Sequence, residues 1–189
     1  MRLATPALIT TERLLLRCLR RSDLAALVQA INDRSVAATT LGIPFPYTMK
    51  DATRWLKQEA ECRRKGTMLN FVVTLRRDGS IVGGVGLSSI STEHHRAELG
   101  YWTASRFRNQ GFCTEAARAV LAFAFGVLKL QRVYATHFPR NPASGRVMRK
   151  LGMKREGRLR RHALRRGRYE DLETYGILAA EFAARPKPG

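Results

Sequence analysis

The stretch Arg108-Asn109-Gln110-Gly111-Phe112-Cys113-Thr114-Glu115 joins a strand-like segment to a long helix-like one. Apolar residues recur at helical spacing over 114–128, so we expect a helix there, with Thr114 either capping it or bonding a phosphate oxygen. A helix N-terminus presents unpaired N–H groups and the positive end of its dipole, and a bare glycine lets an anion approach. Arg106 and Arg108 add positive charge. The stretch therefore predicts an anion site, although a lone glycine before a helix more often only makes a turn.

The residues before this stretch have the pattern of strands. Residues 96–103 alternate around apolar positions, and two apolar runs at 71–75 and 81–82 flank an Asp78-Gly79 turn, which predicts a β-hairpin. Glycines at 83, 84 and 86 lie inside its second strand. No helix follows them, so we interpret them as a strand that another backbone approaches closely, rather than as a dinucleotide-binding loop.

The rest of the chain supplies more strands and helices. Strands are expected near 14–19, 132–138, 153–159 and 169–178. Helices are expected from Ser22-Asp23 to about Asn32, from the capping-box-like Thr48–Asp51 onward, and from Asn141-Pro142 to Gly152. This order predicts an α+β fold with a mixed, mostly antiparallel sheet of about seven strands flanked by helices. We expect one domain over 1–184 and a disordered tail at 185–189.

The composition limits the class of protein. The chain has 189 residues, of which 44% are hydrophobic, and a net charge of +19. This charge predicts attraction to RNA, ribosomes or acidic partners, but a general arginine bias explains it equally well. Cys18, Cys62 and Cys113 form no metal-binding or disulfide pattern, and the longest apolar run, 119–128, is too short to span a bilayer. We expect a cytoplasmic protein without a metal.

Several motifs in order give the central stretch a more specific meaning. They are Ala97-Glu98-Leu99-Gly100-Tyr101-Trp102 before it, and Asn141-Pro142-Ala143-Ser144 and Lys150-Leu151-Gly152-Met153 after it. With Arg108-x-x-Gly111-x-Cys113 they resemble the GNAT acetyltransferase superfamily. The segments Thr11-Glu12-Arg13-Leu14 and Pro44-Phe45-Pro46-Tyr47 resemble the opening of its ribosomal-protein N-acetyltransferase, or Rim-type, branch. The resemblance covers nearly the whole chain.

The resemblance implies an acetyl-CoA-dependent N-acetyltransferase with a GNAT fold, whose central strands splay to hold the cofactor. It implies transfer of the acetyl group directly to a primary amine, most simply the N-terminal amine of a ribosomal-protein-like substrate, and dimers are common in the family. The pyrophosphate is expected on the loop at Gly111 and the pantetheine on the strand before it. The implied cofactor-binding residues are Leu99, Gly100, Tyr101, Trp102, Thr103, Arg106, Arg108, Asn109, Gln110, Gly111, Phe112, Cys113, Thr114, Asn141 and Ser144.

Two residues are candidates for the chemistry. Glu98 is the first candidate for the general base, acting directly or through water, and the alternative is that it only pairs with an arginine. Ser144 could hydrogen-bond the thiolate sulfur, and the alternative is an ordinary serine early in a helix. Asn141 is expected to bond the pantetheine or to cap the helix that follows it, and both roles fit.

The sequence departs from the family pattern at three places. Met148 stands where many members have a tyrosine acting as general acid, which transfers that role to Ser144 or water. Cys113 replaces a glycine or alanine, and we weigh a reactive thiol of lowered pKa against a small buried residue. The carboxylate that Rim-type enzymes tend to carry near His162-Ala163 is absent, which leaves Glu98, His162 or Asp171 as substitutes.

The acceptor is open to alternatives. Phe45, Tyr47, Trp102 and His162 are candidate substrate-binding residues, although core packing explains the aromatics nearly as well. A small amine such as an antibiotic or polyamine could replace the protein substrate, but a polyamine fits a charge of +19 only if the acceptor cleft is locally acidic. Lys154–Arg168, with eight basic residues against one acid, indicates RNA or ribosome docking, either beside catalysis or in place of it.

Overall fold

A computed structural model describes residues 8–184, and the expected disordered tail at 185–189 lies outside them. Eight strands form one sheet in the order β1-β2-β3-β4-β5-β6-β8-β7. All neighbours are antiparallel except β5 and β6, which are parallel. The strands are β1 (Leu8–Thr10), β2 (Leu14–Arg17), β3 (Leu69–Leu75), β4 (Ile81–Ser91), β5 (Arg96–Thr103), β6 (Arg132–His137), β7 (Lys154–Arg165) and β8 (Arg168–Leu178).

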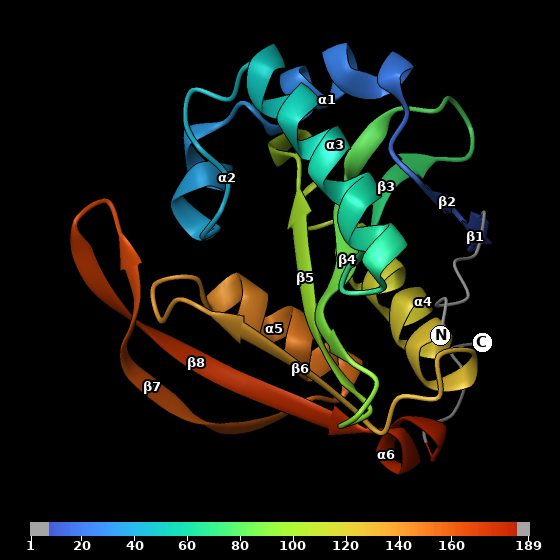
Figure 1. Ribbon diagram of the computed structural model, residues 1–189, viewed down its shortest axis with the longest axis vertical. Coiled ribbons are helices and arrows are strands. Elements are labelled where there is room, and N and C mark those ends of the chain that lie inside the picture. The colour runs from blue at the N-terminus through green and yellow to red at the C-terminus, as the bar shows by residue number, and fades with distance from the viewer. Residues whose placement is uncertain (1–7, 185–189) are drawn as a thin grey trace.

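This architecture confirms the predicted α+β class with one parallel pair. The sequence pattern missed β1, because three residues are too few to show a strand period. It also ended the strand expected at 153–159 too early, since β7 continues to Arg165 through an irregular register between Leu159 and Ala163. The β7–β8 hairpin therefore projects beyond the rest of the sheet (Figure 1).

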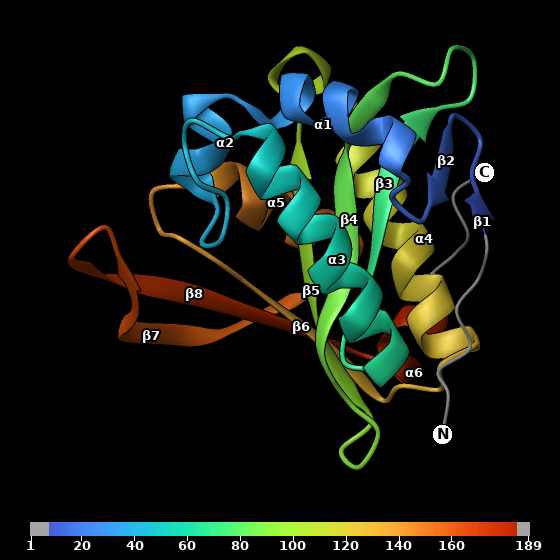
Figure 2. The ribbon, with the colours of Figure 1, turned by 45° about the horizontal axis from the view of Figure 1, so that its top comes forward.

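Helices cover both faces of the sheet (Figures 1 and 2). α1 (Leu24–Ile31) and α3 (Met49–Lys65) pack on one face, and α4 (Phe112–Gly126) and α5 (Pro142–Leu151) pack on the other. α2 (Arg34–Thr39) and α6 (Ala179–Ala183) are short helices that the sequence pattern did not predict, and two 3-10 turns lie at Arg21–Asp23 and Ser105–Phe107. No helix in residues 8–184 is long and apolar enough to cross a membrane.

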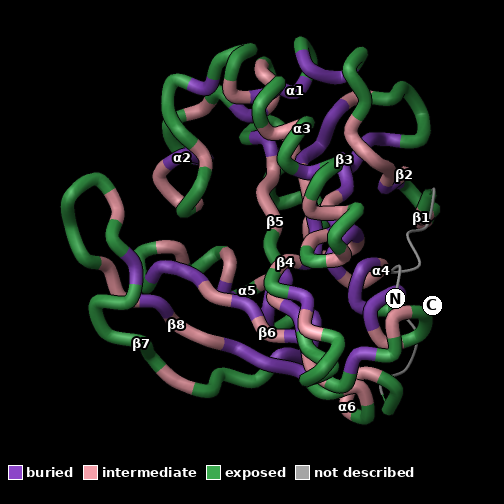
Figure 3. Tube along the Cα trace, viewed as in Figure 1, coloured by how far each residue is buried: buried purple, intermediate pink, exposed green. Residues whose placement is uncertain are grey.

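The main core lies between the sheet and α4. Alternate residues of β3, β4 and β5 meet the apolar side of α4, where Ala117, Val120 and Leu121 are fully buried. A smaller core forms under α1 and α3 on the other face. Figure 3 shows that burial follows α4 and the central strands, whereas β7 and the tip of the projecting hairpin are mostly exposed. The amphipathic patterns thus place a rigid support directly behind β4 and β5.

Most of the helix ends have the capping residues that the sequence predicts. Thr48 and Asp51 form a capping box at the start of α3, and Gly152 ends α5 in the left-handed region at φ 89°. Asp23 is the exception. It lies at the expected start of α1 and is the N-cap of this helix, but its side chain makes no capping bond there. It accepts hydrogen bonds from the Arg17 guanidinium, at 2.6 and 2.9 Å, and from the Arg20 amide at 2.7 Å.

Removal of the Asp23 carboxylate is expected to destabilise the fold. Burial alone would raise the pKa of Asp23, but the bonds from Arg17 and Arg20 outweigh it and hold the pKa below its usual value. Its stabilisation is therefore present at neutral pH and lost as the pH falls through the lowered pKa. We expect Asp23→Asn to cost about 2 kcal/mol, because Arg17 loses its partner while half-buried. Urea unfolding measures this.

The matched control is Glu61→Gln, which breaks an exposed pair with Lys65 on α3. It should change the unfolding free energy by less than about 0.5 kcal/mol. Equal losses in the two variants, or an Asp23→Asn loss that persists unchanged in acid, would show that the Arg17 pair contributes nothing particular to the fold.

Candidate active site

The sheet opens between β5 and β6. The two strands pair only through Arg96–Arg132, Ala97–Val133 and Glu98–Tyr134, and then separate. Over Leu99–Thr103, β5 keeps its partner β4 on one side but has no strand on the other within residues 8–184. Gly100 lies at this opening, and a Cβ added there would meet no atom within 4 Å. The free backbone edge can therefore accept an extended ligand as an additional strand.

A helix N-terminus lies at the same opening. Gly111 is the N-cap of α4 at φ 81°, a conformation that favours glycine, and no side chain caps the helix. The expected start at Thr114 is wrong. The left-handed turn at Gly111 begins the helix two residues earlier, at Phe112, so Thr114 lies in the first turn and does not cap it. The first-turn N–H groups stay free of side-chain caps, which is the arrangement that binds phosphate.

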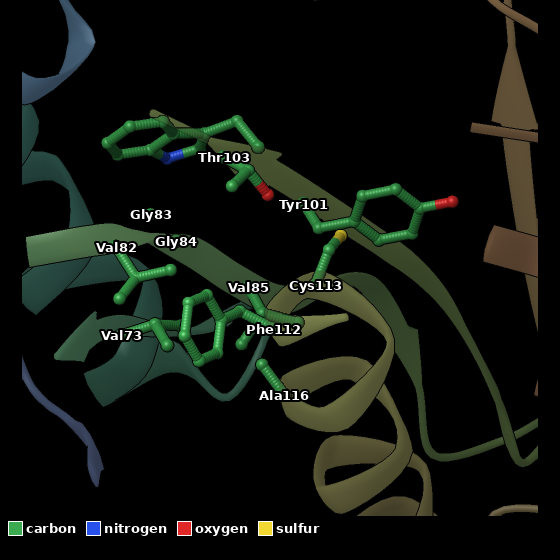
Figure 4. A pocket seen from close by; sticks show the side chains of 11 residues that line it. Val73, Val82, Gly83, Gly84, Val85, Tyr101, Thr103, Phe112, Cys113 and Ala116 are labelled. Atoms are coloured by element: carbon green, nitrogen blue, oxygen red, sulfur yellow. The ribbon is translucent and has the colours of Figure 1, made fainter. Parts of the chain in front are cut away.

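Arg13 holds this helix start in place, and sequence reasoning assigned it no role. Its guanidinium donates to the Gln110 carbonyl at 3.1 Å and pairs with Glu115 at 2.7 Å. It also lies over the Phe112 ring, 4.4 Å from the ring centroid. Arg13 is about a hundred residues away in the chain, so no spacing pattern could have revealed the contact. Figure 4 shows Phe112 turned toward Val73 and Val82, which anchors the first turn in the core.

The loop before Gly111 contributes less free charge than the sequence implied. Arg108 lines the cleft but donates to the Ser35 hydroxyl at 2.8 Å, which ties the loop to α2. Gln110 donates to the Arg106 carbonyl at 3.0 Å, and neither of these two residues lines the cleft. Backbone amides and Arg108 are therefore the anion donors that this loop presents.

One cleft of about 980 Å³ connects the opening with the space under α3. It brings together most of the residues that the sequence singled out. They are Tyr47, Glu98, Leu99, Gly100, Tyr101, Trp102, Thr103, Arg108, Asn109, Gly111, Phe112, Cys113, Thr114, Asn141 and Ser144. Phe45 and His162 do not line it. The Phe45 ring lies against the Arg34 guanidinium, and His162 lies exposed on β7.

Glu98 lies where the strands separate. Its Oε1 accepts a hydrogen bond from the Thr136 hydroxyl at 3.1 Å, and Thr136 stands on β6 across the opening. The alternative that Glu98 pairs with an arginine is not observed, because no ion pair forms at its carboxylate within residues 8–184. Glu98 therefore presents a carboxylate to the cleft that one neutral hydroxyl orients.

The start of α5 lies across the cleft from β5. Asn141 is the N-cap, and its side chain accepts from the Ser144 amide at 3.4 Å, which confirms its capping role. The Ser144 hydroxyl lies 3.0 Å from the hydroxyl of Tyr101, a contact that the sequence did not predict. Met148, by contrast, is only 1% exposed and packs in the core. The hydroxyl groups of Ser144 on α5 and Tyr101 on β5 therefore meet at the cleft.

His137 is a further polar group that sequence reasoning missed. It ends β6 and lines the cleft, and its Nδ1 lies 2.8 Å from the Phe138 carbonyl. Its Nε2 is buried without a hydrogen-bond partner, against the backbone of Gly145 on α5. No metal-binding cluster of His, Cys, Asp or Glu exists in residues 8–184. A lone histidine at a strand end carries no sequence signal of this placement.

Cys113 is expected to be unreactive. Burial raises the pKa of its thiol to about 11, despite a hydrogen bond with Thr103 that lowers it. The interpretation as a reactive thiol of lowered pKa is therefore wrong, since desolvation by burial outweighs the hydrogen bond with Thr103. We expect alkylation of Cys113 at neutral pH to be much slower in the folded protein than in urea, and Cys113→Ala to keep its affinity for coenzyme A. Rapid labelling of folded Cys113, followed by mass spectrometry, would contradict this.

Comparison with known proteins agrees with this geometry. The acetyltransferase (GNAT) domain family matches residues 13–154. The chain is a GNAT acetyltransferase. This acetyltransferase is 32% identical over 176 residues to the uncharacterized N-acetyltransferase YnaD of Bacillus subtilis, covering 92% of this chain and 98% of that protein. The splayed sheet and the Gly111 turn thus belong to a family that uses acetyl-CoA.

Two solved structures resemble the acetyltransferase over most of its length. Mycobacterium smegmatis RimJ, in complex with CoA-disulfide, has 27% identity and a TM-score of 0.82, over 89% of this chain and 83% of that one. A Vibrio cholerae protein, provisionally described as a ribosomal-protein-serine acetyltransferase, has 25% identity and a TM-score of 0.82, over 93% and 99% of the chains. Both are acetyltransferase structures whose fold this chain shares over most of its length.

Proposed function

We propose that this acetyltransferase acts in the cytoplasm and moves an acetyl group from acetyl-CoA to the N-terminal amine of a protein, with ribosomal proteins as the substrate class. The observation that carries the proposal is the position of Glu98. It presents an unpaired carboxylate to a cleft whose other wall holds Ser144 and whose end holds the α4 N-terminus. An anionic cofactor and a neutral amine can thus meet at one point.

The residues of the opening fit the cofactor. The β5 edge at Leu99–Thr103 offers free backbone groups to the amides of the pantetheine arm, and the first turn of α4 with Arg108 offers N–H donors to the pyrophosphate. Gly111 leaves that turn without a side chain, and Asn141 borders the same cleft. When bound, acetyl-CoA supplies an activated thioester carbonyl. Cys113 fits here as a small neutral residue beside the phosphates.

Residues of the chain then accept the amine proton and stabilise the departing sulfur. An α-amino group has a pKa near 8, so only modest help is needed to keep it neutral at physiological pH. Glu98, held by Thr136, accepts a proton from the amine directly or through one water. Ser144 is placed on the opposite wall to donate a hydrogen bond to the departing sulfur. Neither His162 nor Asp171 takes part, because neither lines the cleft.

The charges of the cleft favour a single amine over a polyamine. Three carboxylates line it, and two of them already have arginine partners. Asp51 pairs with Arg54, and Glu59 pairs with Arg63 on α3. Only Glu98 remains for a cationic or neutral nitrogen, whereas a polyamine carries several charges that would each need a carboxylate. Tyr47 and Trp102 give the acceptor side apolar walls suited to a side chain.

The test is a comparison of acceptors under identical conditions. Purified protein and acetyl-CoA are incubated with peptides that carry ribosomal-protein N-termini, with the same peptides blocked at the α-amine, and with spermidine. We expect turnover only with the free α-amine, measured by thiol release and by mass spectrometry of the product. Turnover of spermidine alone would show that the acceptor is a polyamine and not a protein N-terminus. Failure to bind coenzyme A would contradict the proposed acetyltransferase function.

A second activity, docking on ribosomal RNA, is favoured by the tip of the hairpin. The charge is weaker than the sequence implied, because β8 carries carboxylates that neutralise the base of β7. Arg155 pairs with Glu173, and Arg158 pairs with Asp171. The tip keeps four arginines that form no ion pair within residues 8–184, namely Arg160, Arg161, Arg166 and Arg168. Exposed Leu164 and Tyr169 lie among them. The homodimer that the family resemblance implies stays a prediction.

Removal of these four charges is expected to weaken RNA binding without changing peptide acetylation. With all four replaced by glutamine, the slope of log affinity against log salt should fall by roughly 3, since each phosphate contact contributes somewhat less than one. Filter binding to ribosomal RNA over a salt series measures it. Replacement of three exposed cations on α3, Lys50, Lys57 and Arg64, is the control. The same slope in both variants would exclude a docking surface at the tip.

A further inference from the structure

Two hydroxyl groups meet at the wall of the cleft where sulfur chemistry is expected. The Tyr101 hydroxyl lies 3.0 Å from Ser144 Oγ and 3.1 Å from the Ser144 carbonyl oxygen. Tyr101 comes from β5 and Ser144 from the first turn of α5, so the contact spans the opening of the sheet. Figure 4 shows the Tyr101 ring beside the Cys113 sulfur, with its hydroxyl pointing away from α4.

The alternation of β5 explains why this tyrosine is available. Glu98, Gly100 and Trp102 face the side of α1 and α3, whereas Leu99, Tyr101 and Thr103 face the side of α4 and α5. The position on α5 that many family members fill with tyrosine holds Met148, which is buried in the core and has no hydroxyl. In residues 8–184, Tyr101 is the phenol that contacts Ser144.

A hydrogen bond between the two hydroxyl groups has two solutions for its proton, because each hydroxyl has one proton and two lone pairs. In the first, Tyr101 donates to the Ser144 carbonyl and accepts the Ser144 proton, so Ser144 has no proton left for a ligand. In the second, Tyr101 donates to Ser144 Oγ, and the Ser144 proton is free to point into the cleft. Only the second solution makes Ser144 a donor to sulfur.

We propose that Tyr101 is a positioning residue, which donates its proton to Ser144 Oγ and thereby directs the Ser144 hydroxyl proton at the sulfur of coenzyme A. The inference rests on the proposed function. In the transfer, a nitrogen–carbon bond forms and the carbon–sulfur bond breaks, and its electron pair stays on sulfur. The nitrogen loses one proton to Glu98 or water, and the sulfur finally takes one from water. Until then, the Ser144 O–H stabilises the negative sulfur.

The surroundings of Tyr101 keep it in the role of donor. Burial raises the pKa of its hydroxyl, more than the bond with Ser144 lowers it, so it stays protonated at physiological pH. It therefore donates a hydrogen bond and does not give up its proton as an acid. Besides Tyr101, the titratable or charged groups that line the cleft are Tyr47, Asp51, Arg54, Glu59, Glu98, Arg108, Cys113, His137, Arg146 and Lys150.

The decisive measurement is the pKa of the thiol of bound coenzyme A, followed by ultraviolet absorbance of the thiolate. In the wild-type protein this pKa should lie below that of free coenzyme A, because a hydrogen bond to the charged form favours it. Tyr101→Phe keeps the ring and should reduce the bound thiolate fraction about tenfold. Ser144→Ala should do the same, and the double variant should lose no more than Ser144→Ala alone.

Tyr134→Phe is the matched control, since Tyr134 lies on the neighbouring strand β6 and does not line the cleft. It should leave the thiol pKa unchanged. In kinetics, Tyr101→Phe should lower kcat while its affinity for coenzyme A in calorimetry stays as in the wild type. That split separates positioning from a loss of folding, which would weaken binding as well.

Two results would overturn the inference alone. One is an unchanged thiol pKa in Tyr101→Phe, and the other is a double variant in which the two losses simply add. Both can occur in an active acetyltransferase, so they leave the proposed function standing. A wild-type protein that does not bind coenzyme A would overturn both.

Discussion

Gly111→Asp is expected to weaken coenzyme A binding roughly 100-fold, the effect of losing charge-assisted hydrogen bonds worth about 3 kcal/mol. Two physical effects act together. Gly111 has a φ of 81°, which an L side chain adopts only with strain. A carboxylate at this N-cap would also compete with phosphate oxygens for the first-turn amides of α4, and would repel them. Calorimetry with coenzyme A measures the loss.

Gly79→Asp is the control for strain and charge. Gly79 has a nearly equal φ of 73°, lies in the β3–β4 turn, and does not line the cleft. It should destabilise the fold somewhat but leave coenzyme A affinity unchanged. Gly111→Ala separates the two effects at the site itself, because it adds strain without charge. If Gly111→Asp binds coenzyme A as the wild type does, the pyrophosphate is not bound at α4.

Glu98→Gln is expected to lower kcat by about 100-fold, the smaller end of the usual contribution of a general base, with little change in cofactor affinity. Glutamine keeps the size of the side chain and can still accept the bond from Thr136, but it cannot take a proton. The ratio of wild-type kcat to Glu98→Gln kcat should increase toward acid pH, because more of the amine is protonated there and its deprotonation limits the rate. Steady-state rates across a pH series test this.

Glu93→Gln serves as the control for loss of a carboxylate, because Glu93 is exposed in the turn between β4 and β5 and lies outside the cleft. Its rates should match those of the wild type. A Glu98→Gln protein with wild-type kcat at every pH would show that Glu98 has only a structural role, as the acceptor of the Thr136 hydrogen bond.

Local signals in the sequence predicted the parts of this protein that neighbouring residues determine. The α5 helix between Asn141 and Gly152 is an example, because an N-cap, a first-turn proline and a C-terminal glycine fix both of its ends. The strand at 96–103 was predicted with its correct bounds because its residues alternate around apolar positions. Family resemblance then placed the cofactor loop, though not the start of its helix, which depends on the backbone turn at Gly111.

Contacts between distant segments could not be predicted in this way. Arg13 holds the α4 start from the other end of the chain, and Tyr101 reaches Ser144 across the opening. The charge of the hairpin is a third case. Lys154–Arg168 looked strongly basic by itself, but the antiparallel register places Asp171 and Glu173 beside its arginines. Pairing between strands, which linear composition does not show, decides how much charge remains free.

The short pairing between β5 and β6 has a consequence for the stability of the whole protein. Three residue pairs are the direct link in the sheet between the strands β1–β5 and the strands β6–β8. If the pantetheine arm pairs with the β5 edge, the acetyl donor becomes a structural element of the enzyme as well as its reagent. Ligand concentration then sets how firmly the two halves of the sheet hold together, because binding to the native state alone raises its stability.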